Sequence, residues 1–236
     1  MMTRCLLFAL LLGSLGCKKE DDTYTVGNKD GVALSHVISF YSVTPVRLDA
    51  DSATTCTITV KISAEASSGN NGVHFSTDGG TFANGDTSQT VTANSEGYAS
   101  AYLLSNKSKQ VHVRASVIST YSIDTTVTFV PALPDDLLLT ADTYTGDTST
   151  TFNVTGTLYR NVQRGKVFEP VKVVFSVVPR DTTVNLVYPA FAFSQGQTAT
   201  VTLTNPYKVT GRFDVTSKVL SSGGDSLSRT ILLEIK

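Results

Sequence analysis

The sequence predicts an all-β protein made of two antiparallel β-sandwiches in tandem. Short segments with strict alternation of apolar and polar residues recur along the chain, which is typical of strands with one buried face. Clusters of Gly, Asn, Asp and Ser separate these segments, and no helical period is sustained. The pattern of the first half also returns in the second. A chain of 236 residues has room for two domains, each with its own core.

The first sandwich is predicted over residues 36–130. Its clearest strand surrounds Ile58, because Cys56, Ile58, Val60 and Ile62 are apolar and the residues between them are polar. The same alternation marks further strands at 72–75, 98–103, 111–117 and 127–129. Each such strand has one face to bury, so an antiparallel sandwich is the expected arrangement.

A short linker is predicted over residues 131–136, where Pro131 and Pro134 restrict the backbone. A second sandwich is predicted over 137–236. Its segment Ala199–Leu203 matches Ala99–Leu103 at an offset of one hundred residues. The repeat is a match of pattern more than of identity.

Four motifs of the first domain, in their order, resemble bacterial Ig-like domains of the invasin/intimin type. They are Asp49–Asp51, Gly72–Ser76, Gly79–Phe82 and Asn94–Ala99. The resemblance covers residues 40–130 and extends more faintly over 135–236, which lacks the glycine pair and the Asn-x-x-Gly turn. It implies two Ig-like modules that act as a stalk, sometimes ending in an adhesive tip, and it brings no catalytic residues.

The N-terminal end predicts export and a lipid anchor. An apolar run at Leu6–Leu12 follows Arg4 and has the length of a signal-peptide core, too short to span a bilayer. The following Ser14–Cys17 segment resembles a bacterial lipoprotein box. This resemblance implies a signal peptide at residues 1–16, cleavage before Cys17 and acylation of that cysteine.

Residues 17–35 are predicted to be a lipidated, flexible tether, since they are polar and show no sustained period. The acidic run within Lys18–Asp22 also resembles the surface-export signal of Bacteroidetes-type lipoproteins. A solvated, charged leash is the alternative interpretation. The expected location is the cell outer membrane with surface exposure, and the sequence leaves open whether the protein faces the periplasm or the exterior.

The cysteine positions and the net charge argue against an intramolecular disulfide and against nucleic-acid binding. Cys5 would leave with the signal peptide and Cys17 would carry lipid, so only Cys56 remains and no intramolecular disulfide is expected. Cys56 falls on the buried phase of its strand, where a thiol behaves as a small apolar side chain. The formal net charge of −1 without a basic patch argues against nucleic-acid binding.

Tyr98 and Tyr102 are the candidate ligand-facing residues, because they point outward if Ala99 and Leu103 point inward. Outward aromatic residues can bind sugars, but they also stabilise ordinary sheets. We expect the turn at 105–109 to be a hairpin that sets Tyr102 near His112. The apolar segment at 188–193 is a second candidate surface, or a buried strand.

Neither a metal site nor a catalytic site is predicted. His36, His74 and His112 are not spaced as zinc ligands, and no nucleophile–base pair or carboxylate dyad stands out. Acidic residues precede the first strands at similar places in both domains: Asp49, Asp51 and Asp142. Turn capping is the favoured role for them, with calcium binding as the alternative.

These observations favour a non-catalytic surface lipoprotein that serves as a stalk, adhesin or assembly component, without a cofactor. The alternative is a glycan-binding accessory lipoprotein of an outer-membrane polysaccharide uptake system. The first function needs a membrane anchor and surface partners, while the second also needs an aromatic platform for glycans.

Overall fold

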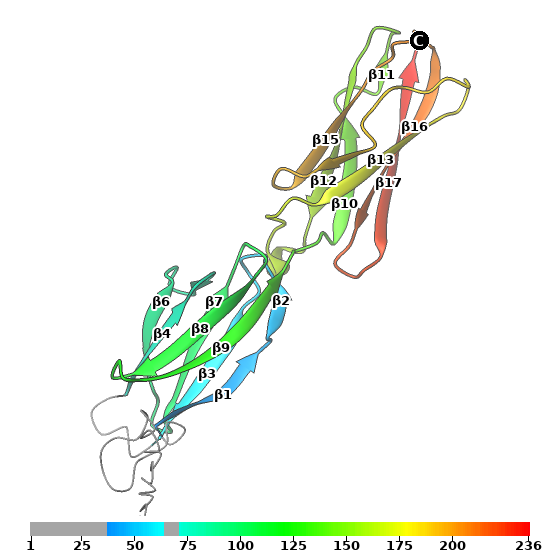
Figure 1. The fold of residues 1–236 in the computed structure, drawn as a ribbon. Coiled ribbons are helices and arrows are strands. Elements are labelled where there is room, and N and C mark those ends of the chain that lie inside the picture. Colours follow the sequence, from blue (N-terminus) through cyan, green and yellow to red (C-terminus); the bar gives the residue numbers. More distant parts are fainter. Residues whose placement is uncertain (1–36, 64–70) are drawn as a thin grey trace, which may run out of the picture.

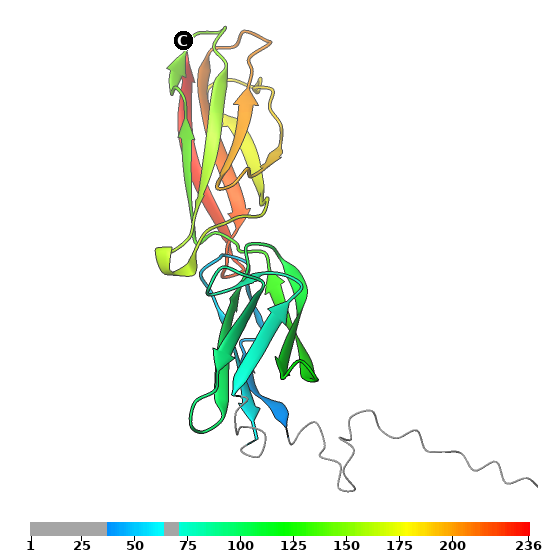
Figure 2. The ribbon, with the colours of Figure 1, turned by 90° about the vertical axis from the view of Figure 1, so that its left-hand side faces the viewer.

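The chain forms two β-sandwiches placed end to end in an elongated body (Figures 1 and 2). The computed structural model describes residues 37–63 and 71–236. The predicted signal peptide, the predicted tether with Cys17, and His36 lie outside the described residues. Within the described ranges, no helix is long and apolar enough to cross a membrane.

Domain one contains a four-stranded sheet with the order β1-β3-β7-β5 and a five-stranded sheet with the order β2-β9-β8-β4-β6. Its strands are β1 (Ile38–Thr44), β2 (Arg47–Asp49), β3 (Cys56–Ile62), β4 (Gly72–Thr77), β5 (Thr81–Phe82), β6 (Ser88–Thr92), β7 (Tyr98–Leu104), β8 (Lys109–Val117) and β9 (Tyr121–Val130).

Domain two contains a three-stranded sheet with the order β10-β12-β15 and a five-stranded sheet with the order β11-β17-β16-β13-β14. Its elements are β10 (Asp136–Ala141), β11 (Thr145–Gly146), β12 (Phe152–Tyr159), the 3₁₀ turn η2 (Val162–Arg164), β13 (Lys172–Pro179), β14 (Phe191–Phe193), β15 (Thr198–Leu203), β16 (Gly211–Leu220) and β17 (Ser226–Ile235).

The five-stranded sheets of the two domains share one topology, and the smaller sheets differ only by β5. The two strand orders correspond position by position: β2-β9-β8-β4-β6 in domain one matches β11-β17-β16-β13-β14 in domain two. In each domain, a short early strand pairs in parallel with the last strand, as β2 with β9 and β11 with β17. All other pairings between named strands are antiparallel. The all-β fold class with tandem sandwiches is therefore confirmed.

The residues that the alternation in the sequence predicts to be buried do form the two cores. Ile58 and Phe75 are fully buried in domain one, and Phe152, Phe175 and Phe213 are buried in domain two. The buried residues form two separate clusters, one in each domain. Each sandwich therefore has its own apolar core, which is the main driving force for its folding.

The expected hairpin between Tyr102 and His112 is wrong. β7 pairs with β3, so that Tyr102 lies opposite Thr57, while β8 pairs with β9 and His112 lies opposite Thr126. The residues between β7 and β8 cross from one sheet to the other. Alternation shows which face of a strand is buried, but it does not identify the neighbouring strand.

The chain enters each domain at one end and leaves it at the other (Figure 1). β2 runs in the same direction as β9, because the two strands are parallel. The N-terminal side of domain one and the C-terminus of the chain therefore lie at opposite ends of the body (Figure 1).

Candidate functional site

The contact between the two domains is built around the buried side chain of Arg160. This residue follows β12 and continues the inward phase of Val154 and Leu158. Its side chain is 0% exposed. An inward-facing arginine at the end of a strand must find acceptors, because an unpaired buried charge is very costly.

Arg160 finds these acceptors on both domains and on the linker. Its Nη2 atom donates to Asp49 Oδ2 at 2.8 Å and to Asp51 Oδ2 at 3.1 Å. Nη1 donates to the carbonyl oxygen of Leu133 at 2.5 Å, and Nε donates to that of Arg164 at 3.0 Å. Every nitrogen of the guanidinium group thus has a partner, which is the condition under which a buried charge is tolerated.

Asp51 serves both its own turn and the neighbouring domain. Its Oδ1 accepts from the amides of Ala53 and Thr54 at 2.9 and 2.7 Å, so the predicted turn-capping role is confirmed. Its side chain is 0% exposed, and its other oxygen accepts from Arg160. Turn capping therefore holds this carboxylate in place for the arginine of domain two.

A second, more exposed ion pair flanks the first. Arg164 Nη1 donates to Asp135 Oδ1 at 2.7 Å, and Arg164 Nη2 reaches Asp49 Oδ2 at 3.4 Å. Asp135 also accepts from the Ser222 hydroxyl and from the amide of Asn161. Partial burial raises the pKa of Asp135, but these hydrogen bonds and the charge of Arg164 outweigh it and hold that pKa below its ordinary value.

Backbone contacts complete the junction. The amide of Lys166 donates to the carbonyl oxygen of Asp51 at 3.2 Å, and the amide of Ser108 donates to Glu169 Oε1 at 2.7 Å. Gly165 has φ of +72°, and a Cβ atom there would lie 2.1 Å from the Asp51 carbonyl oxygen. Only glycine allows this approach of the two backbones.

The linker is fixed by hydrogen bonds as well as by its prolines. The carbonyl oxygen of Leu133 accepts from Arg160, and that of Pro134 accepts from the amide of Ser222. Ala132 is buried. Asp136, the last residue of the predicted linker, is already the first residue of β10.

Sequence reasoning missed Arg160, although a signal was present. Phe152, Val154, Gly156 and Leu158 alternate inward, and Arg160 is the next residue of that phase. An arginine on a buried phase predicts a buried ion pair, but nothing local shows that its partners lie more than one hundred residues earlier.

The predicted aromatic candidates do not form a shared platform. Tyr98 packs edge-on against Tyr41, with ring centroids 4.8 Å apart, and Lys61 Nζ lies 4.6 Å from the Tyr98 ring centroid. Tyr102 is 48% exposed on the same strand, and no ring contact is found for it among the described residues. The pair thus divides into a packed Tyr98 and an isolated Tyr102.

The other candidate residues occupy structural positions. His74 and His112 are exposed on the polar phase of their strands. Asp142 accepts from Asn153 and Thr143, and it lies far from the junction that its counterparts form. Within residues 37–63 and 71–236, no group of three His, Cys, Asp or Glu side chains could hold a metal ion.

Cys56 is buried, as its phase predicts, and burial raises the pKa of its thiol to about 11. The segment at 188–193 forms an edge strand instead of a core strand. Its Phe191 and Phe193 side chains are 47% and 56% exposed, and Lys172 Nζ lies 4.4 Å from the centroid of the Phe191 ring.

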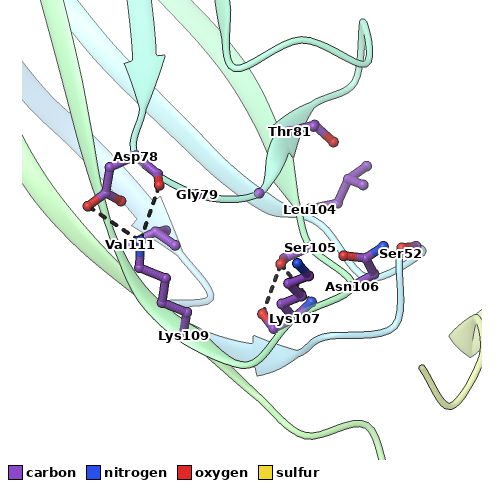
Figure 3. A pocket seen from close by; sticks show the side chains of 11 residues that line it. Ser52, Asp78, Gly79, Thr81, Leu104, Ser105, Asn106, Lys107, Lys109 and Val111 are labelled. Atoms are coloured by element: carbon purple, nitrogen blue, oxygen red, sulfur yellow. Dashed lines mark hydrogen bonds and ion pairs between the residues drawn. The ribbon is translucent and has the colours of Figure 1, made fainter. Parts of the chain in front are cut away.

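An open cavity of about 400 Å³ lies on domain one, beside the turn that carries Ser52 (Figure 3). Two sets of its polar groups bond to each other. Lys109 Nζ donates to the Asp78 carbonyl oxygen, and the Ser105 hydroxyl bonds with the backbone of Lys107 (Figure 3). The lining residues offer no nucleophile next to a base, so the cavity shows no catalytic arrangement.

Comparisons with known proteins support the fold and leave the activity open. No family model matches the chain, and no curated protein matches it. Among solved structures, the adhesin InvE of Yersinia pseudotuberculosis is 16% identical, with a TM-score of 0.53, over 85% of this chain and 59% of that one. Invasin, a bacterial integrin-binding protein, is 17% identical, with a TM-score of 0.61, over 84% of this chain and 39% of that one.

The chain spans less than two thirds of the length of either structure. The matched share of this chain is 85% or 84%, which is close to the share that the two sandwiches together occupy. The identities are low, so the likeness is one of fold. The two domains of this chain have the Ig-like fold of the invasin/intimin type.

Proposed function

We propose that this protein is a stalk-like adhesin of the bacterial cell surface, in which two Ig-like domains hold the distal end away from a membrane. The observation that carries this proposal is the Arg160 junction. A buried guanidinium group that bonds to two carboxylates of domain one and to the linker restrains the angle between the domains. A stalk needs such a restrained joint, whereas an accessory binding module does not.

The arrangement of the chain ends supports the same function. The N-terminal side lies at one end and the far end of domain two lies at the other (Figure 2). If Cys17 is acylated, domain one is next to the membrane and domain two points away from it. The likeness to InvE, described as an adhesin, and to integrin-binding invasin supports a protein partner at the cell surface.

Glycan binding is less favoured, because the Tyr98 ring already packs against Tyr41 and Lys61. Tyr102 makes no ring contact with it among the described residues. The proposed lipid anchor has its own test: the membrane-extracted protein should begin at an acylated Cys17. Mass spectrometry that finds Met1, or an unmodified residue 17, would contradict the anchor.

The restrained angle can be tested by small-angle X-ray scattering on residues 31–236. We expect the profile of an elongated rod with a narrow distribution of distances. Arg160→Met removes the charge and keeps an apolar stem, so it should broaden that distribution. Gly165→Ala should do the same without touching either core, because its Cβ atom would collide with Asp51.

Arg229→Met is the matched control. Arg229 forms an exposed ion pair with Asp136 within domain two, at 2.6 Å. Exposed pairs contribute little, so this variant should scatter like the parent. A compact profile for the parent, or equal breadth in all variants, would contradict the stalk.

A further inference from the structure

Domain one is closed by a pair of parallel strands, its second strand β2 and its last strand β9. β2 pairs with β9 through Arg47 and Thr128, Leu48 and Phe129, and Asp49 and Val130. Backbone bonds flank this register, from the Thr128 amide to Val46 and from the Ala50 amide to Val130, both at 2.8 Å.

Tension along the rod would load these bonds in a particular way. The chain enters domain one below β2 and leaves it above β9 (Figure 1). Pulling on the two ends loads β1 against β3 and, through the two residues between β1 and β2, slides β2 and β9 past each other along their own axes. The bonds between parallel strands are evenly spaced, so they share such a load instead of breaking one after another.

The last residue of β2 is also held by domain two. Asp49 accepts from Arg160 at 2.8 Å and from Arg164 at 3.4 Å, while it lies opposite Val130 in the β2–β9 pair. Asp51, two residues later, accepts from Arg160 in a buried position. β2 is thus attached to β9 on one side and to the neighbouring domain at its end.

From this geometry we propose that domain two braces the β2–β9 pair of domain one against tension, with Arg160 as the main link. The direction of the load rests on the stalk function proposed above, since it requires an anchor on the N-terminal side and a partner at the distal end. Under that load, domain two moves with β9 and away from β2. The Arg160–Asp49 contact then bears force in parallel with the strand bonds.

Burial strengthens the Arg160–Asp51 contact most, because the Asp49 side chain remains 28% exposed. Water competes with an exposed ion pair and screens it, whereas charges inside a protein interact more strongly. Arg160 and Asp51 both have fully buried side chains. Domain two has the corresponding parallel pair, β11 with β17, but it has only two register pairs and lies at the end farthest from domain one (Figure 1). Domain one cannot brace it there.

Optical-tweezers measurements on the full chain, made with a handle fused at each end, test the proposal. A flexible insert of about 30 residues after Gly196 lengthens the domain-two event by roughly 100 Å and so identifies it. This position is an exposed turn with open space around it. At constant force, Arg160→Met should make domain one unfold at least about tenfold faster, equivalent to about 1.4 kcal/mol.

Two further variants keep the test decisive. Arg229→Met, in the exposed pair of domain two, should leave the domain-one rate unchanged. Asp49→Asn removes the braced charge from within domain one, and it replaces Arg160→Met if that variant shows no domain-two event. It should also accelerate the unfolding of domain one.

An unchanged domain-one rate in Arg160→Met, with the domain-two event intact, would overturn the brace. So would an unchanged rate in Asp49→Asn where Arg160→Met shows no domain-two event. Equal acceleration by Arg229→Met would overturn it too, because the effect would not depend on the junction. These outcomes are separate from those of the scattering test. A flexible joint in scattering together with a rate that depends on Arg160 would contradict the stalk and keep the brace.

Discussion

At the scale of single residues, the cores of this protein contain polar atoms with and without partners. Ser194 is buried, and its hydroxyl accepts from the Val171 amide at 2.9 Å. Ser217 is fully buried, and its hydroxyl has no hydrogen-bond partner among the described residues. The two serines of domain two therefore allow a direct comparison of a satisfied and an unsatisfied hydroxyl.

Ser217→Ala should leave the free energy of unfolding unchanged or raise it by up to about 1 kcal/mol, because it removes an unpaired buried group. Ser194→Ala should lower it by about 1–3 kcal/mol, because the Val171 amide loses its acceptor. Urea denaturation of both variants measures the difference. Equal losses would mean that the Ser217 hydroxyl has a partner.

The thiol of Cys56 should be unreactive in the folded protein. At pH 8, an exposed cysteine is partly ionised, whereas burial raises the pKa of Cys56 to about 11 and also excludes the reagent. Iodoacetamide labelling followed by peptide mass mapping should find Cys56 modified only in denaturant.

The raised pKa of Cys56 also makes the stability of the folded state depend on pH. The unfolded chain loses the thiol proton near its ordinary pKa of about 8.5, while the folded chain keeps it up to about pH 11. The folded state therefore binds more protons in this window, and stability should fall as the pH rises through it. Cys56→Ala should remove this part of the dependence, and labelling of native Cys56 at pH 8 would contradict its burial.

At the scale of strands, the inward phase of β3 carries the stability of domain one. Ile58→Ala should cost about 2–5 kcal/mol, since it removes a fully buried side chain and leaves a cavity. Thr57→Ala, on the opposite face of the same strand, should cost less than about 0.5 kcal/mol. Chemical denaturation provides both values, and similar losses would contradict the register.

Many of the strands and their buried faces could be predicted from the sequence, because alternation is a local signal. The pattern around Ile58 identified β3 and its buried face, and the match of Ala199–Leu203 to Ala99–Leu103 identified β15 as the counterpart of β7. The partner of β7 could not be predicted, since a crossing between sheets and a hairpin leave the same alternation. The junction could not be predicted either, because Arg160 meets acceptors that are distant in sequence.

At the scale of the whole molecule, the two domains should differ in their resistance to tension. Domain one has three register pairs between its two parallel strands and a brace from domain two, whereas domain two has two such pairs and no brace. When the two domains with an intact junction and the insert after Gly196 are pulled from both ends, domain two should therefore unfold first.

The lengthened domain-two event described above identifies the order in the same pulling traces. Domain one unfolding first in most traces would contradict this expectation. The order should reverse, or become mixed, in Arg160→Met, because that variant removes the advantage of domain one alone.

The opposite positions of entry and exit in each sandwich set how reach scales with module number. A strand of ten residues, such as β9, spans about 34 Å, so each module adds roughly that distance along the axis and almost nothing across it. The length of the rod then grows linearly with the number of modules, while its width stays constant. A flexible chain of n residues gains reach only as the square root of n. Ordered modules of about 100 residues each therefore overtake an unstructured spacer of equal length only beyond roughly three modules, but they hold the distal end at a fixed distance from the first module on.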